Sequence, residues 1–270
     1  MSDHERIEAA VEAAVVRLTE QGCPPRLAEA MRHAVLGRGH RLRPRLLLAV
    51  CRAVRGEATD LAVTTATALE LLHCASLVHD DLPCFDDAPV RRGAPSVHRA
   101  HGEAVAVLAG DALIIGAFEL IGEAAAMGTG VGRLVALLGR AAGAPGGTAA
   151  GQGWEGESDA RARSATASKD TSLFEFAAMA GALAGGADPE PWRELGRRIG
   201  LAYSHARDLG REPRGPAAGP GAVPTRGSGP GPDADLAALI RSAIDAVPAC
   251  EGEDALRGFV AQVLESLSGV

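Results

Sequence analysis

Aromatic residues, lysine and paired cysteines are all scarce in this chain of 270 residues. Phe, Trp and Tyr make up 3% of it, so its core has to be built from Ala, Leu, Val and Ile, which favours closely packed helices. Lys169 is the only lysine, and arginine supplies nearly all other positive charge. The five cysteines are odd in number and form no CxxC pair, which predicts reduced thiols rather than a disulfide framework.

A basic charge balance and long apolar runs are also lacking. The formal net charge of −7 argues against nucleic-acid binding, which normally needs a basic surface. The most apolar stretch, residues 104–118, contains Asp111, so no uninterrupted run is expected to span a membrane. The first residues are acidic and lack an apolar signal region. With 47% hydrophobic and 23% charged residues, the chain is expected to be a folded, cytoplasmic protein.

Apolar residues recur at helical spacing along most of the chain. This periodicity predicts helices over residues 7–18, 27–36, 46–54, 61–78, 104–127, 131–142, 174–184, 191–209, 235–247 and 254–267. The stretch 61–78 is apolar on nearly every face, which places it at the centre of the fold. No pair of alternating runs flanks a hairpin turn, so no hairpin is expected. The predicted fold class is all-α.

Glycine and proline interrupt the helical pattern in one segment. They make up thirteen of the twenty-three residues from 210 to 232. Proline removes backbone donors and glycine carries the largest backbone entropy, so this segment is expected to be a flexible loop. We therefore expect a single domain, with a helical body over 1–209, the loop over 210–232 and the last helices over 233–270.

Charged residues gather where the central predicted helix ends. They are Asp80, Asp81, Asp86, Asp87, Arg91 and Arg92. Leu82 precedes Pro83 and should stop the helix, which leaves the first two carboxylates at its negative end. Carboxylates that converge there repel one another unless a cation lies among them, and hard oxygen ligands suit Mg²⁺ together with a substrate phosphate. The alternative, a solvated acidic loop beside a basic pair, stays open on these residues alone.

A second basic cluster lies upstream, at His40, Arg41, Arg43 and Arg45. Its spacing suits a second phosphate, because guanidinium groups bind phosphate oxygens in pairs. It is equally compatible with a solvated helix start, with Pro44 near the first helical position. Taken alone, this cluster favours the solvated helix start.

Together these segments resemble the trans-polyprenyl diphosphate synthase family, and within it the bacterial geranylgeranyl diphosphate synthases of carotenoid pathways. The family motif GGxRxRP is similar to RGHRLRP at 38–44, and the first aspartate-rich motif, DDxxxxD, is matched by Asp80, Asp81 and Asp86. LELLHCASLVHDDLP at 69–83, SVH at 96–98 and GQ at 151–152 match as well. The resemblance runs from about residue 5 to 210, and more weakly beyond.

The resemblance implies a bundle of mostly antiparallel helices around a deep apolar cavity, usually in a homodimer. Family members join isopentenyl diphosphate to an allylic diphosphate, head to tail. The chemistry is ionisation of the allylic diphosphate, attack of the isopentenyl double bond on the allylic cation, and loss of a proton. Such a step needs stabilisation of the leaving group and exclusion of water. A heteromer with a catalytic prenyl synthase is a further expected assembly.

Residue by residue, the resemblance implies a metal site and an allylic diphosphate site. Asp80, Asp81 and Asp86 would bind Mg²⁺, and Arg91 would bind the allylic diphosphate. Lys169 matches a lysine that normally contacts the same diphosphate. Asp80, Asp81 and Lys169 are thus the expected catalytic residues.

The resemblance also implies a separate site for isopentenyl diphosphate. His40, where the family usually has lysine, would hold this substrate together with Arg43, His73 and Arg92. Gln152, from the GQ pair, is a further expected substrate-binding residue.

The second aspartate-rich motif of the family, FQxxDDxxD, is degenerate here. The aligned stretch 203–211 keeps only Asp208, and arginine stands at positions 207 and 211. The family's lysine–threonine pair is Lys169–Asp170. Two readings follow. The chain is either a prenyl synthase of impaired activity, in which Arg207 and Arg211 take over part of the metal's electrostatic role, or a non-catalytic subunit that binds prenyl diphosphates.

Two smaller predictions concern packing. Ala75 and Ser76 lie one turn before Asp80, so both are expected to face the floor of the cavity, where small residues would leave room for longer products. Asp111 is expected to be a buried, hydrogen-bonded carboxylate inside its apolar helix.

Overall fold

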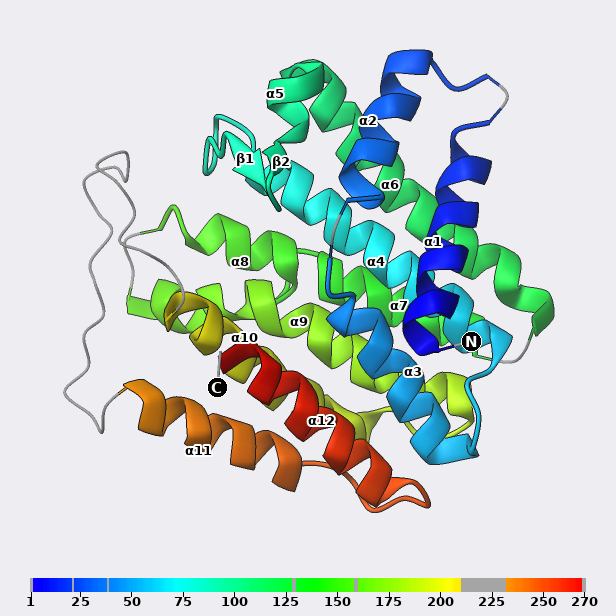
Figure 1. Cartoon of the computed structure of the whole chain (residues 1–270), viewed down its shortest axis with the longest axis vertical. Coiled ribbons are helices and arrows are strands. Elements are labelled where there is room, and N and C mark those ends of the chain that lie inside the picture. The colour runs from blue at the N-terminus through cyan, green and yellow to red at the C-terminus, as the bar shows by residue number, and fades with distance from the viewer. Residues whose placement is uncertain are drawn as a thin grey trace.

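A computed structural model describes residues 2–20, 22–37, 39–127, 130–157, 160–209 and 232–268 of the chain. These residues form helices and a single two-stranded hairpin (Figure 1). The elements are α1 (Asp3–Leu18), α2 (Pro25–Val35), α3 (Leu42–Arg55), α4 (Asp60–Asp80), β1 (Val90–Arg91), β2 (Ala94–Pro95), α5 (Val97–His101), α6 (Glu103–Glu123), η1 (Ala124–Met127), α7 (Val131–Ala142), α8 (Thr148–Trp154), α9 (Ala160–Gly185), η2 (Glu190–Trp192), α10 (Arg193–Leu209), α11 (Pro232–Asp245) and α12 (Glu253–Ser268). The all-α prediction is confirmed.

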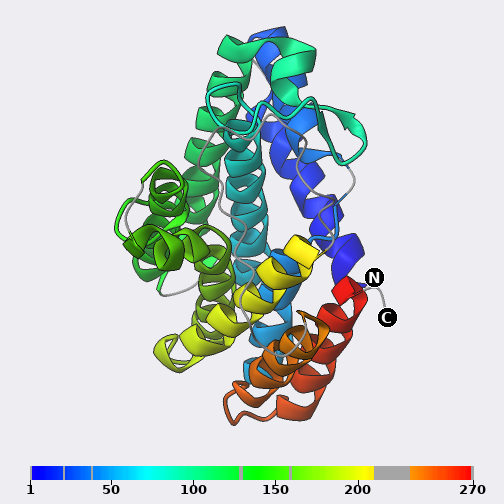
Figure 2. The same cartoon turned by 90° about the vertical axis from the view of Figure 1, so that its left-hand side faces the viewer.

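Helix α4 is the central element of the fold (Figure 2). Thr59 caps its start, because its hydroxyl accepts a hydrogen bond from the backbone N–H of Ala62 at 3.1 Å. Its apolar side chains are buried against α1, α2, α3, α6, α7 and α9. Its end falls at Asp80, just before Leu82 and Pro83, as the sequence predicts. The buried helix therefore delivers the aspartates of the first motif to one end of the bundle.

Helices α4 and α6 approach closely at Gly110. A Cβ atom at this glycine would lie 2.1 Å from Nε2 of His79, so only glycine leaves room for the imidazole. The neighbouring Asp111 lies 3.7 Å from the same nitrogen, and its side chain is 55% exposed. The prediction that Asp111 is buried is wrong. It lies on the side of α6 that the described part of the chain leaves uncovered.

A short antiparallel hairpin follows the first motif, where the sequence predicted none. Val90 pairs with Pro95 and Arg91 with Ala94. The two turn residues, Arg92 and Gly93, both have positive φ angles, of 54° and 83°. This is the backbone of a tight primed turn, which suits the twist of paired strands. Two residues per strand are too few for an alternating pattern, so the hairpin could not be recognised from periodicity.

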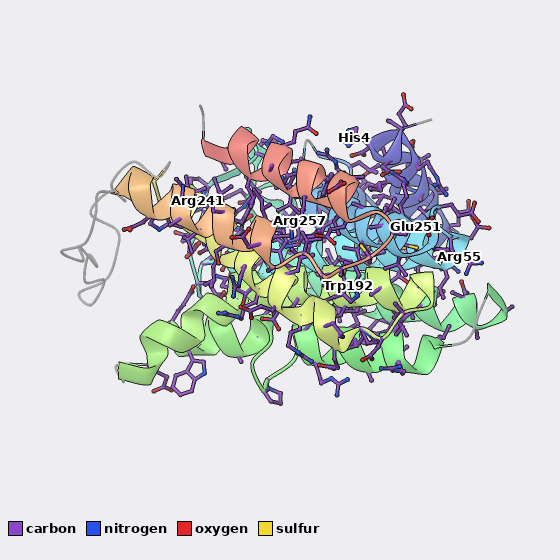
Figure 3. The ribbon with its side chains drawn as sticks, turned by 90° about the horizontal axis from the view of Figure 1, so that it is seen from below. His4, Arg55, Trp192, Arg241, Glu251 and Arg257 are labelled. Carbon is purple, nitrogen blue, oxygen red and sulfur yellow. The ribbon has the colours of Figure 1, made fainter. Side chains whose placement is uncertain are left out.

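The last two helices close the lower side of the bundle. Helix α11 packs on α10, and α12 packs on α11, α10 and α3 (Figure 3). The backbone N–H of Gly252, between α11 and α12, donates to the carbonyl of Ala53 at 2.9 Å. A Cβ atom at Gly252 would lie 2.6 Å from the Cα of Ala53, which explains the glycine. The predicted Gly/Pro loop lies outside the described residues except for Pro232, which begins α11.

Two helices have the length and hydropathy of a membrane span by composition alone. They are α4, whose most apolar window is 72% buried, and the stretch Glu103–Ala126, whose window is 44% buried. Core helices of soluble proteins have the same properties, so these helices are weak evidence for a membrane segment. The absence of such a segment therefore stays a prediction.

Candidate active site

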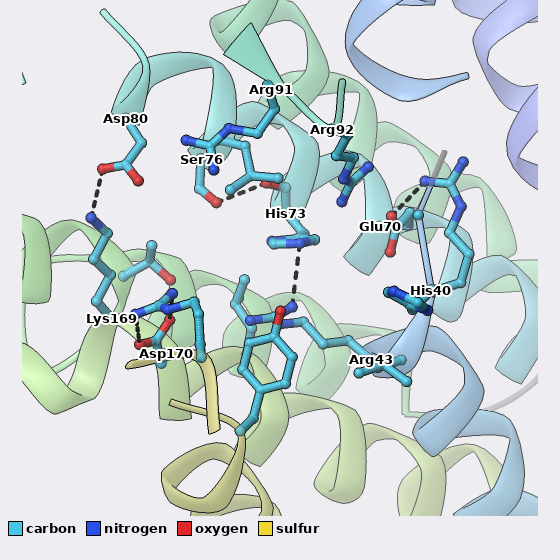
Figure 4. A pocket seen from close by; sticks show the side chains of 18 residues that line it. His40, Arg43, Glu70, His73, Ser76, Asp80, Arg91, Arg92, Lys169 and Asp170 are labelled. Carbon is cyan, nitrogen blue, oxygen red and sulfur yellow. Dashed lines mark hydrogen bonds and ion pairs between the residues drawn. The ribbon is translucent and has the colours of Figure 1, made fainter. Parts of the chain in front are cut away.

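Many charged side chains line a cavity of about 640 Å³ (Figure 4). The loop before α3, the start of α3, the helices α4, α8, α9 and α10, and the hairpin supply its walls. Its charged residues are Arg41, Arg43, Glu70, Asp80, Arg91, Arg92, Lys169, Asp170 and Arg207. Basic side chains outnumber carboxylates two to one, so the cavity as a whole favours an anionic ligand.

One end of the cavity is built around Arg43 and His73. Nη1 of Arg43 donates to Nε2 of His73 at 3.2 Å, because a guanidinium has no acceptor. The Arg43 guanidinium also lies 4.4 Å from the ring centre of Phe174 and 5.2 Å from that of Tyr203. Burial, and next the charge of Arg43, hold the pKa of His73 well below its usual value. A neutral histidine and two rings, rather than a carboxylate, therefore position this cation.

Arg41 anchors the loop that carries His40 into the cavity. It adopts a left-handed backbone with φ of 47° directly before α3. Its fully buried guanidinium donates from Nη1 to Glu70 at 2.6 Å, from Nε to Glu8 at 2.8 Å and from Nη2 to the carbonyl of Val35 at 2.8 Å. Burial opposes its charge, but these carboxylates outweigh that effect and raise the pKa of Arg41. The loop is thus tied to α1, α2 and α4.

The two arginines of the hairpin, Arg91 and Arg92, have different neighbours. Nε of Arg91 donates to both carboxylate oxygens of Asp81, at 2.9 and 3.1 Å. The Asp81 side chain is almost fully buried, and burial raises its pKa although Arg91 acts to lower it. Arg92 instead extends beside Gly39, where a Cβ atom would lie 3.0 Å from Nη1 of Arg92. Gly39 therefore leaves the space through which Arg92 reaches the cavity.

At the other end of the cavity, the single lysine bridges α9 to the first motif. Nζ of Lys169 lies 2.6 Å from Oδ1 of Asp80 and 3.2 Å from Oε1 of Glu155. Gln152 donates to the same Glu155 at 3.0 Å. A Cβ atom at Gly151 would lie 2.5 Å from the backbone nitrogen of Lys169, so this glycine lets α8 pack directly on α9. The GQ pair thus serves the placement of Lys169.

The residue after the lysine forms a second ion pair at the same end. Asp170 accepts from Nη1 of Arg207 at 2.8 Å and from Nη2 at 2.6 Å. The hydroxyl of Ser204 donates to the same carboxylate at 2.8 Å. Position 207 is therefore tied to α9 by a bidentate pair. The side chain of Asp208, and Arg211 as a whole, lie outside the described residues.

A second, apolar cavity of about 460 Å³ adjoins the first. Its apolar walls include Leu72, Phe85, Val107 and Ile114. The two cavities share Ser76, Asp80, Thr148 and Lys169, so charge and hydrocarbon surface meet at the Asp80–Lys169 pair. Ala75 lines neither cavity and is fully buried in the core. Ser76 thus lines the cavities as predicted, whereas the prediction for Ala75 is wrong.

The donor chemistry of the first motif fits a hard divalent cation. Asp80 and Asp81 each hold a cationic side chain, Lys169 and Arg91 respectively. Asp86 is exposed, and its backbone N–H donates to the carbonyl of Asp80 at 3.0 Å. Within the described ranges, no group of three or more His, Cys, Asp or Glu side chains is close enough to hold a metal. The oxygen ligands suit Mg²⁺, but they are not gathered into one cluster.

The structure brings most of the predicted site residues to one cavity. His40, Arg43, His73, Asp80, Arg91, Arg92 and Lys169 line the charged cavity. Gln152 lines the apolar one, while Asp81 lies behind the hairpin and Asp86 faces outward. Sequence reasoning assigned no role to Glu70 and Tyr203, and it treated Asp170 only as a lost threonine. Glu70 and Tyr203 lie far in the sequence from Arg41 and Arg43, which they contact, so no local pattern could report these contacts.

Comparison with known proteins identifies the class to which this fold and site belong. The family model described as Polyprenyl synthetase matches residues 24–209. The chain is a member of the polyprenyl synthetase family. It is 43% identical over 280 residues to the geranylgeranyl diphosphate synthase of Cereibacter sphaeroides, covering 99% of this chain and 97% of that protein. It is 41% identical over 273 residues to the protein of the same name from Rhodobacter capsulatus, covering 96% and 94%.

Solved structures support the same fold. A crystal structure of an FPP/GFPP synthase from Zymomonas mobilis superposes with a TM-score of 0.78 at 30% sequence identity, covering 96% of each chain. A geranyltransferase from Legionella pneumophila superposes with a TM-score of 0.80 at 24% identity, covering 98% of this chain and 93% of that one, and shows the likeness of fold alone. The isoprenoid synthase fold predicted from the sequence is confirmed.

Proposed function

We propose that this chain condenses isopentenyl diphosphate with an allylic diphosphate to give geranylgeranyl diphosphate. The main support for this proposal is that the charged and the apolar cavity meet at Asp80 and Lys169. A prenyl diphosphate needs a charged site for its diphosphate next to an apolar site for its hydrocarbon chain. The names of the relatives at 43% and 41% identity support the product. The small side chain of Ser76 at the junction, which leaves room for an elongating chain, supports it further.

Magnesium is part of the proposal. Asp80, Asp81 and Asp86 would hold it, and when bound it supplies positive charge to the diphosphate that leaves the allylic carbon. Lys169 and Arg91 are then the cations that exchange their carboxylate partners for phosphate oxygens. Both already line the cavity in which the diphosphate would bind. The ion pairs keep the carboxylates compensated until a diphosphate arrives.

The opposite end of the cavity suits isopentenyl diphosphate. Arg43 and Arg92 supply cationic donors there, and His40 and His73 supply imidazole nitrogens. The neutral His73 accepts a hydrogen bond from Arg43, which fixes the guanidinium for phosphate binding. The apolar walls of the second cavity, among them Leu72 and Phe85, exclude water from the prenyl chain.

We further propose a reduced rate for this reaction. Arginine at positions 207 and 211 stands where the family resemblance implies metal-binding carboxylates. A guanidinium neutralises phosphate but does not act as a Lewis acid. Loss of about 4 kcal/mol of transition-state stabilisation would lower the rate about a thousandfold.

The test of the function is a product assay with the full chain. Purified protein, Mg²⁺, isopentenyl diphosphate and dimethylallyl, geranyl or farnesyl diphosphate should give geranylgeranyl diphosphate by mass spectrometry. No product longer than the allylic substrate would refute the proposal. The chain would then be a binding or scaffolding subunit, and addition of a catalytic prenyl synthase would be the next arm of the assay.

We also propose that the protein is a soluble, cytoplasmic homodimer. Helix α6 exposes Val107, Leu108 and Ile115, whose exposed fractions are 41%, 55% and 67%. Side chains this apolar on one helix favour a partner that removes them from water. Sedimentation of the wild type should give twice the chain mass. Leu108→Glu together with Ile115→Glu should give the mass of one chain, and a monomeric wild type would contradict the assembly.

A further inference from the structure

Arg207 occupies a place in the cavity that the reaction outlined above does not use. Its guanidinium makes the bidentate pair with Asp170 described above, and Ser204 adds a third hydrogen bond to that carboxylate. The Asp170 side chain is 10% exposed, whereas that of Arg207 is 38% exposed. The carboxylate is thus enclosed by its partners, and the Arg207 side chain is the more exposed member of the pair at the cavity wall.

The pair sits on a close and extensive contact between two helices. A Cβ atom at Gly200 of α10 would lie 2.7 Å from the Cα of Thr171 on α9, and one at Gly196 would lie 2.4 Å from the carbonyl oxygen of Phe174. The two helices are therefore held at short range over about one turn, which ends two turns before Arg207. A cation fixed by such a scaffold loses little further freedom when it binds an anion.

Arg207 also lies at the end of the cavity that faces the first motif. Asp170, its partner, directly follows Lys169, which contacts Asp80 at 2.6 Å. In Figure 4, Lys169, Asp80 and Asp170 lie toward one side of the cavity and His40 lies toward the other. Lys169, Asp170 and Arg207 all line this cavity, so an anion held there by Lys169 shares the cavity with the Arg207 guanidinium.

We propose that Arg207 is a diphosphate-binding residue, which Asp170 and Ser204 orient toward the allylic end of the cavity. This rests on the proposed function, because it names a further contact for the same diphosphate. The arginine supplies a permanent monovalent charge on α10, where the family resemblance implies a metal-binding carboxylate. A carboxylate is still present nearby, but it belongs to Asp170 on α9, where it pairs with Arg207.

The test is calorimetric titration of the full chain with inorganic pyrophosphate, with and without Mg²⁺. Arg207→Gln should raise the dissociation constant about tenfold or more in both buffers, since a charged hydrogen bond is lost. Arg197→Gln, which removes an exposed arginine of the same helix that pairs with Glu194, is the matched control and should bind as the wild type does. Equal affinity of Arg207→Gln and wild type would overturn the proposal, even if the melting temperature falls.

A second variant guards against misfolding from an unpaired carboxylate. Arg207→Gln with Asp170→Asn removes both charges, leaves the net charge of the cavity unchanged and allows the two amides to hydrogen-bond. It too should bind pyrophosphate about tenfold more weakly. Wild-type affinity in this double variant would show that the pair only ties α9 to α10, and would refute a binding role.

The outcome separates this inference from the proposed function. If wild type forms longer prenyl products while the Arg207 variants keep both the pyrophosphate affinity and the KM for the allylic diphosphate, the role of Arg207 is refuted and the function stands. If the wild type forms no prenyl product longer than its allylic substrate, but the Arg207 variants bind pyrophosphate more weakly than the wild type does, the proposed function fails and the anion contact of Arg207 stands.

Discussion

The two ends of the charged cavity hold their cations in different ways. At the Asp80 end, Lys169, Arg91 and Arg207 each pair with a carboxylate, from Asp80, Asp81 and Asp170 respectively. At the other end, Arg41 is also paired with carboxylates, from Glu8 and Glu70, but the partner of Arg43 is a neutral imidazole, with the rings of Phe174 and Tyr203 beneath the guanidinium. At one end each of these cations is therefore neutralised, whereas at the other Arg43 is a cation to which no carboxylate of the described residues is bound.

The difference indicates which end depends on a metal. At the Asp80 end, a diphosphate has to replace the carboxylates that pair with Lys169 and Arg91, and these released carboxylates then need a cation of their own. At the Arg43 end, an anion meets a positive charge that burial and π faces hold in place. Divalent metal is expected to matter for the allylic diphosphate and much less for isopentenyl diphosphate.

The largest expected effect comes from removing the carboxylate at the junction of the two cavities. Asp80→Asn should lower kcat/KM for prenyl transfer about a thousandfold, because it removes an expected metal ligand and the partner of Lys169. Isopentenyl diphosphate should bind as in the wild type. Asp188→Asn, at an exposed ion pair with Arg133, is the control and should leave kcat/KM unchanged. A loss of less than tenfold in Asp80→Asn would contradict the assignment.

A smaller effect is expected at the other end. Arg43→Gln should raise the KM for isopentenyl diphosphate about 10- to 100-fold, since one charged hydrogen bond contributes about 1.5–3 kcal/mol. The KM for the allylic diphosphate and its metal dependence should stay the same. The control is Arg45→Gln on the same helix, where the guanidinium lies 5.6 Å from the ring centre of Phe259. A similar rise for both substrates would remove the distinction between the two ends.

The smallest effect concerns the charge state of His73. Its folded pKa lies below the usual value, so its contribution to stability is present above about pH 6.5 and is lost as the pH falls. His73→Gln keeps a hydrogen-bonding group but cannot titrate. In urea unfolding, this variant should lose about 1–2 kcal/mol less than wild type between pH 7 and pH 5. His4→Gln, at an exposed histidine of α1, should follow the wild type, and parallel loss in His73→Gln would argue against a neutral His73.

The sequence predicted most of the long helices and one part of the site, for physical reasons, but it missed the short helices α5 and α8 and the first half of α9. The apolar pattern of 61–78 and the break at Leu82–Pro83 determine where α4 ends, and thus where Asp80 stands. The Asp170–Arg207 pair joins residues that are 37 positions apart, and no local pattern reports the distance between them. Ala75 and Ser76 are successive residues of one helix, so they point about 100° apart and only one lines the cavities.

Other failures had different causes. Asp111 was expected to be buried because its neighbours are apolar, yet the described part of the chain does not cover that face of α6. The hairpin at 90–95 depends on two successive positive φ angles, and arginine is an uncommon residue for the first of them. Both errors concern features that tertiary contacts, rather than local composition, decide.

The single lysine makes the site chemically addressable. Apart from a terminal amine, Lys169 is the only primary amine that the chain offers to an acylating reagent. Its side chain is 17% exposed and sits between Asp80 and Glu155 at the cavity. The extent of acetylation at Lys169, measured by mass spectrometry, would therefore differ between a protein with an empty cavity and one with a ligand in it. Because arginine replaces lysine elsewhere in the chain, the one lysine can serve as a specific labelling site at the cavity.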